Sequence, residues 1–288
     1  MRISSQQIFD AGIQALQKHS GDVVEYQRQI SSGQRFSKAS DSPLAAGLGV
    51  QVSLKRSVFT MYKTNQDVVS TNLASTDTQL SSLQNMVSRF QQMMVQASND
   101  AAGSDVRKQL AFQADVLINS VKKFSEAEDA NGEAILSLSA VSKVMVAPTI
   151  ELDSALTYEE VMGRTAPGTQ AATPIPATGA VDILYILEQV KSNLASGLAP
   201  DPAHVDAIQR ALSQISKAQA KTGVLQNELD AAVTAAEQQK QNAETNRSTL
   251  LDTDLSEATA GLARSNALLQ AVQTVISGMD TNSLFKKL

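Results

Sequence analysis

Two histidines, His19 and His204, are the side chains of this sequence best suited to general acid–base chemistry near neutral pH. Each falls in a segment with a helical pattern, and neither has an acidic neighbour at a spacing that suggests a catalytic dyad. A solvated or packed histidine explains both positions without a reaction.

The other candidate sites have equally simple structural explanations. The glycines of "AGLGVQ" (46–51) lack the spacing and the preceding strand of a dinucleotide site. The carboxylates of "DTD" (252–254) could bind a cation, but an N-cap for a restarting helix is the better interpretation. The adjacent acids of "LTYEEV" (156–161) point in different directions on a helix, and we expect them to be solvated.

The amino-acid composition excludes all chemistry that depends on cysteine. The chain has no cysteine, which rules out disulfides, thiolate metal sites and cysteine nucleophiles. We therefore predict no catalytic residue, no cofactor, no metal and no enzymatic activity.

Charge and hydropathy argue against nucleic acid as a partner and against insertion into a membrane. The net charge is −5 and no stretch forms the basic patch that nucleic acid requires. No run approaches the ~20 apolar residues of a membrane span, so we expect no membrane insertion. The first twenty residues have polar side chains distributed throughout and lack the apolar core of a secretory signal, so we expect that the chain stays in the cytoplasm or leaves without a cleaved signal peptide.

Proline divides the chain. Six of seven prolines lie between Pro148 and Pro202, which leaves two long flanks free to be helical. Both flanks carry the alternating four- and three-residue spacing of a coiled-coil seam. Aromatic residues make up only 4% of the chain, which suits elongated helical packing better than a thick core.

The first flank contains three predicted helices. Gly33 is a plausible stop for the first helix, and "SDSP" restarts the chain with Ser42 as N-cap and Pro43 in the first helical position. "SNDAAGSD" (98–105) predicts a turn with a new cap, and the third helix should end near "DANG" (129–132).

The middle has a different pattern. Residues 134–148 predict one or two strands, and residues 164–180 predict an exposed loop. A short helix should span Ile183 to Leu194, and "DP" (201–202) should cap a long one from 203 to about 251.

The last helix has two adjacent apolar stripes. After "DTD" its seam runs from Leu255 through Ala258, and Leu268 and Val275 mark a second stripe beside it. Burial inside its own domain would explain an apolar helix of this kind. We favour self-assembly, in which one stripe faces the first helix and the other faces neighbouring copies.

These elements predict a mainly α fold. The two flanks form an elongated antiparallel helical bundle or coiled coil, with a small β-containing middle domain at its tip. The expected domains are an inner helix and loop (1–42), the two halves of a helical rod (43–133 and 203–251), a middle domain (134–202) and a C-terminal inner helix (252–288).

Three motifs in order resemble the bacterial flagellin superfamily. They are "QISSGQRFSKASDSPLAA" (29–46), "TGVLQNEL" (222–229) and "LLDTDLSEATAGLARSNALLQAV" (250–272). The residues that carry the resemblance are Ser31, Gly33, Ala39, Asp41, Pro43, Gly223, Asn227, Asp252 and Asp254. Within that superfamily, the start "MRISS" and the late "SLF" (283–285) resemble the members that join hook to filament, whereas "KKL" (286–288) departs from them.

The resemblance implies a structural adaptor in the extracellular flagellum, exported unfolded through a type III channel. Its implied partners are copies of itself in a ring, the other hook-filament junction protein, flagellin and an export chaperone. A filament-forming flagellin and an intracellular coiled-coil scaffold are the alternatives. We expect the assembly interface to consist of Phe9, Ile13, Leu16, Val23, Ile30, Leu262, Leu269, Val272, Ile276, Met279, Leu284 and Phe285.

Overall fold

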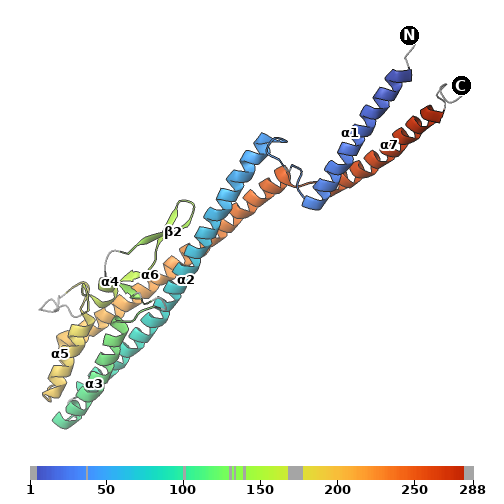
Figure 1. The fold of residues 1–288 in the computed structure, drawn as a ribbon. Coiled ribbons are helices and arrows are strands. Elements are labelled where there is room, and N and C mark those ends of the chain that lie inside the picture. The colour runs from blue at the N-terminus through green and yellow to red at the C-terminus, as the bar shows by residue number, and fades with distance from the viewer. Residues whose placement is uncertain are drawn as a thin grey trace. The chain divides into compact units, whose positions relative to one another are not determined.

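A computed structural model describes residues 5–36, 38–99, 102–129, 132, 134–138, 141–167 and 178–281. The described helices are α1 (Ser5–Ser32), α2 (Pro43–Ala97), α3 (Ser104–Ser125), α4 (Tyr158–Met162), α5 (Ile183–Ala195), α6 (Pro202–Leu251) and α7 (Leu255–Thr281). The strands are β1 (Leu136–Ser137), β2 (Lys143–Ala147), β3 (Ile150–Asp153) and β4 (Leu156–Thr157). Figure 1 shows that long helices dominate the fold, which confirms the mainly α prediction.

The chain folds as two compact units. The terminal unit contains residues 1–57 and 239–288, and the central unit contains residues 58–238. The long helices α2 and α6 contribute residues to both units.

The helix boundaries follow local signals. Ser42 Oγ accepts a hydrogen bond from the Ala45 backbone N–H at 3.2 Å, and Pro43 opens α2 as expected. Asp201 Oδ1 accepts from the Ala203 N–H at 2.8 Å at the start of α6. The new cap expected before α3 is absent: the N-cap residue is Gly103, which has no side chain to accept the bond. The end of α3 at Ser125 also precedes the predicted end near "DANG".

The central unit has a fully buried core. Its largest fully buried side chains come from α2, α3, α5 and the segment between α3 and α5 (the middle segment, residues 126–182), and α6 completes the cluster. On α2 these are Leu73, Leu80, Leu83, Phe90 and Met94, which confirms the predicted seam. Helices α2 and α6 also meet through polar groups, since Gln219 Nε2 donates to Ser81 Oγ at 3.3 Å.

The middle segment forms two small sheets. β2 and β3 make an antiparallel hairpin that pairs Lys143 with Asp153, and β1 and β4 pair in parallel. The predicted strands in 134–148 correspond to β1 and β2, whereas β3 and β4 lie beyond the predicted range. An isolated hairpin is marginally stable in water, so it needs support from the helices.

That support comes from amide side chains of the long helices. Asn65 Nδ2 donates to the Met145 carbonyl at 2.8 Å, and the buried Gln66 donates to Val146 at 2.7 Å. Gln214 of α6 similarly bonds the Val161 carbonyl and the Val181 N–H. The middle segment is thereby fixed against the sides of α2 and α6.

One acid of "LTYEEV", Glu160, has a role that the sequence interpretation missed. Thr157 and Glu160 form a reciprocal capping box at the start of α4. Glu160 also forms an ion pair with Lys221 of α6 at 2.7 Å. Burial opposes ionisation of Glu160, but the bonds from Lys221 and Thr157 outweigh it and lower the pKa of the carboxyl. Glu160 therefore joins the middle segment to the rod and is not simply solvated.

Directly after α4, the backbone at Gly163 packs closely against the backbone at Val181. Gly163 has a positive φ of 73°, and a Cβ placed on it would lie 2.0 Å from the Val181 carbonyl oxygen. Beside it, Arg164 forms an ion pair with the largely buried Asp182 at 2.6 Å, and Asp182 also caps α5. The backbone of residues 163–164 is thus held tightly against the start of α5.

Replacement of this glycine should test the packing of the middle segment. We expect Gly163→Ala to destabilise the central unit by more than about 2 kcal/mol, because the methyl group meets backbone atoms and the φ is strained. The matched control is Gly223→Ala, which faces open space in α6 and should be neutral or stabilising by up to about 1 kcal/mol. Chemical denaturation followed by circular dichroism measures both, and an unchanged midpoint for Gly163→Ala would contradict this packing.

Candidate assembly interface

The terminal unit is built on the pairing of α1 with α7, which lie side by side (Figure 1). A Cβ on Gly12 would meet Ile276 at 3.2 Å, and a Cβ on Gly261 would meet the Tyr26 ring at 2.5 Å. The numbers of the facing residues change in opposite directions, so the two helices run antiparallel.

The seam between these helices is only partly covered. On α7, Ala258 and Ser265 are buried, and both have small side chains. The larger expected interface residues of the two helices are half-buried, namely Leu16, Val23, Ile30, Leu262, Leu269, Val272 and Ile276. Phe9 is 42% exposed and Ile13 is 37% exposed. Two helices alone therefore do not bury the apolar residues that this pair carries.

The second stripe of α7 faces solvent within this unit. Leu268 is 39% exposed and Val275 is 58% exposed. Leu255 is 56% exposed, so the seam begins at Ala258 and not at Leu255 as predicted. The Met279 side chain and residues Leu284 and Phe285 lie outside the described part of the chain.

Residues of the three flagellin-like motifs are here called signature residues, and those of the first and third motifs meet where the loop after α1 passes the link between α6 and α7. Gly33 ends α1 with a positive φ of 67°, as predicted, and its carbonyl accepts from the Thr253 N–H at 3.0 Å. The Arg35 N–H donates to the Leu251 carbonyl at 2.8 Å, and Gln34 forms an antiparallel bridge with Asp252. The sequence identified both segments but not their pairing.

The "DTD" carboxylates act structurally here. Asp254 Oδ1 accepts from the N–H groups of Ser256 and Glu257, at 2.8 and 3.2 Å, which confirms the predicted cap of α7. Asp252 forms an ion pair with Arg247 at 3.4 Å. No cluster of three or more potential metal-binding His, Cys, Asp or Glu side chains occurs within the described ranges.

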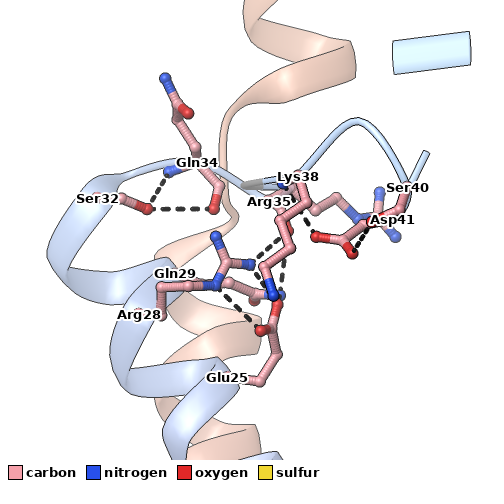
Figure 2. A network of polar contacts seen from close by, with 9 residues as sticks. All are labelled: Glu25, Arg28, Gln29, Ser32, Gln34, Arg35, Lys38, Ser40 and Asp41. Atoms are coloured by element: carbon pink, nitrogen blue, oxygen red, sulfur yellow. Dashed lines mark hydrogen bonds and ion pairs between the residues drawn. The ribbon is translucent and has the colours of Figure 1, made fainter. Parts of the chain in front are cut away.

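Figure 2 shows the polar network that holds the loop after α1. Glu25 accepts from Arg28 Nε at 3.0 Å and from Gln29 Nε2 at 3.1 Å, and Gln29 also donates to the Arg35 carbonyl at 3.2 Å. The bond from Arg28 lowers the pKa of the Glu25 carboxyl. Farther along the loop, Asp41 Oδ2 accepts from the Lys38 N–H at 3.1 Å. The loop is therefore tied to the last turns of α1.

The remaining signature residues lie elsewhere. Gly223 and the exposed Asn227 belong to the part of α6 in the central unit, beside the buried Leu225 and Leu229. Ser31, Ala39 and Asp41 are exposed in the terminal unit.

The histidines lie in different units. His19 Nδ1 lies 3.4 Å from an Asp22 carboxylate oxygen, a partner that the sequence interpretation overlooked. His204 lies in the first turn of α6. In the described part of the chain, no helix is both long enough and apolar enough to cross a membrane.

Substitution of Gly261 should loosen the α1–α7 pair. A methyl group there displaces the Tyr26 ring from α7, and we expect a net cost of about 1 kcal/mol after the gain in helix propensity. Amide hydrogen exchange in both helices should then become about five-fold faster. Gly21→Ala is the control, since it faces open space on α1 and should leave exchange unchanged or slower. Equal exchange in the Gly261→Ala variant and the unaltered chain would show that the helices do not meet at this residue.

Comparisons with known proteins point to one family. The bacterial flagellin N-terminal helical region matches residues 3–140, and the C-terminal helical region matches residues 205–286. The chain is 22% identical to flagellar hook-associated protein 3 of Escherichia coli over 84% of this chain and 74% of that protein. It is also 22% identical to flagellin of Listeria monocytogenes, over 91% of this chain and 90% of that protein.

Solved structures support the fold. A putative flagellar hook-associated protein from Vibrio parahaemolyticus matches with a TM-score of 0.61 and 18% identity, over 74% of this chain and all of that one. Hook-associated protein 3 from Legionella pneumophila matches with a TM-score of 0.58 and 14% identity, over 69% of this chain and 98% of that one. Because the two flagellin helical regions together span most of its length, the chain belongs to the bacterial flagellin superfamily.

Proposed function

We propose that this protein is a structural adaptor of the bacterial flagellum that forms the junction between hook and filament. The observation that carries the proposal is the α1–α7 pair, whose apolar side chains are only partly covered within one chain. In a member of the flagellin superfamily, such a pair is suited to burial against further copies of itself.

The choice of a junction protein over a filament protein rests on the relatives. Curated relatives from Escherichia coli and Salmonella typhimurium are named flagellar hook-associated protein 3, and the "MRISS" and "SLF" segments agree with that name. The Listeria flagellins have the same 22% identity, so sequence identity alone does not separate the two roles. The intracellular scaffold alternative has less support, because family matches cover both flanks.

The assembly interface is expected at the half-covered seam and the exposed stripe. On α1 it includes Phe9 and Ile13, whose exposure leaves them available to neighbours. On α7 it includes Val272 and Ile276, and we extend it to Met279, Leu284 and Phe285 on the sequence pattern alone. Burial of these side chains would contribute roughly 25 cal/mol per Å² of apolar surface.

The proposed partners follow from the same surface. Copies of the chain would form a ring, with the other hook-filament junction protein on one side and flagellin on the other. Before export, a flagellar chaperone would cover α7, and the chain would leave through the type III channel. We assign the protein no catalytic role.

Deletion of the gene tests the proposed function. Cells that lack this protein should have no attached filaments and should shed flagellin into the medium, because the filament has no base on which to assemble. Motility and electron microscopy measure the first outcome, and flagellin in the culture supernatant measures the second. Intact motility after deletion would contradict the proposal, and purified protein that polymerises alone into long filaments would favour the filament alternative.

A further inference from the structure

Methionine carries all of the sulfur in this chain, which has eight methionines and no cysteine. A thioether reacts with peroxides to give methionine sulfoxide, and exposure to solvent favours the reaction. Among the described residues, the exposed methionines are Met61, at 47%, and Met145, at 40%. Met93, Met94 and Met162 are buried in the core of the central unit. Peroxide in solution should therefore reach Met61 and Met145 first.

Met145 lies where the β2–β3 hairpin meets α2. Its carbonyl accepts a hydrogen bond from Asn65 Nδ2 at 2.8 Å, which fixes the backbone of β2 against the helix. One turn earlier on α2, the Tyr62 hydroxyl donates to the Met145 sulfur at 3.7 Å. These two contacts hold the sulfur beside the hydroxyl, although the Met145 side chain remains partly open to solvent.

The Tyr62 hydroxyl has a weak partner in this contact. Tyr62 is buried, and a thioether sulfur is a weak hydrogen-bond acceptor. Oxidation replaces this acceptor with the oxygen of a polar sulfoxide, which accepts more strongly. An oxygen bonded to the sulfur would fit between the two atoms, because the 3.7 Å separation allows a hydroxyl–oxygen distance of about 2.7 Å.

We propose that Met145 is an oxidation site, and that its sulfoxide holds the hairpin against α2 more tightly than the thioether does. A lone pair of the sulfur attacks one oxygen of hydrogen peroxide, the O–O bond breaks and hydroxide leaves. The hydroxide takes the proton from the transferred oxygen, which gives water and the sulfoxide. The sulfur loses two electrons and the peroxide gains them. The Tyr62 hydroxyl then donates to the new oxygen.

The position of Met145 decides the direction of the effect. A sulfoxide in a packed core is disruptive, because it places a polar group among apolar side chains. At Met145 the new oxygen lies at a partly exposed edge, and a hydrogen-bond donor already faces it. The inference is independent of the proposed function, since it concerns a contact within the central unit of a single chain.

Peptide mass spectrometry of the full-length protein after treatment with hydrogen peroxide tests whether the site reacts. Met61 and Met145 should each gain one oxygen, while the buried Met93, Met94 and Met162 should remain unoxidised. An unmodified Met145 under conditions that oxidise Met61 would show that Met145 is not an oxidation site.

Amide hydrogen exchange in β2 and β3 tests the consequence. In the Met61→Leu variant, which retains Met145, exchange should be about five-fold slower after peroxide treatment, because the stronger acceptor stabilises the closed hairpin. The matched control is Met145→Leu, which retains Met61 and should show no change on treatment. A methionine sulfoxide reductase should return the oxidised Met61→Leu variant to its original exchange rate.

Tyr62→Phe in the Met61→Leu background separates the hydrogen bond from other effects of oxidation. Phenylalanine keeps the ring that packs edge-on against Phe59, with ring centroids 6.3 Å apart, but it has no hydroxyl. Met145 should still be oxidised in this variant, and exchange in the hairpin should not become slower. Unchanged or faster exchange in oxidised Met61→Leu would overturn the inference, as would equally slowed exchange in the oxidised Tyr62→Phe variant.

Discussion

Incomplete burial between α1 and α7 is the constraint on which the proposed role depends. Two antiparallel helices can cover only one face of each other, and here the most deeply covered positions of α7 are the small residues Ala258 and Ser265. The larger side chains of the seam remain half-exposed, and a second stripe on α7 has no cover within the unit. Since stability comes largely from apolar burial, this pair gains little from its own chain, and burial against neighbours would add to its stability.

The central unit contrasts with this pair. Its core closes around large side chains of α2 such as Leu73 and Phe90, with the small sheets and α5 packed against them. The bonds of Asn65 and Gln66 to β2, and the Glu160–Lys221 ion pair, anchor the middle segment to the long helices. A self-sufficient unit joined to one whose apolar side chains are incompletely covered is suited to a subunit that folds before it assembles.

Local signals in the sequence predicted much of this fold. Heptad spacing located the long helices, Ser42 and Pro43 located the start of α2, and Gly33 located the end of α1, because each acts through backbone geometry within one turn. Asp254 was identified as a cap for the same reason. The short strands β3 and β4 were missed, since elements of two to four residues carry too little periodicity.

The sequence predicted that the N- and C-terminal flanks pair, but not which residues of the connecting loops meet. The bridge between Gln34 and Asp252 joins residues more than two hundred positions apart, and no local pattern encodes it. The exposure of Leu255 was also mispredicted, because the heptad pattern assumes that the seam continues to the first turn of α7.

The most direct test of assembly-dependent burial is thiol labelling at a single introduced cysteine. Val275→Cys places a reactive group on the exposed stripe of α7 in a chain without native cysteine. A maleimide reagent should label this residue rapidly in the purified monomer and at least ten-fold more slowly in intact flagella, where neighbouring subunits cover the stripe. Equal labelling rates in the monomer and in the flagellum would contradict the account.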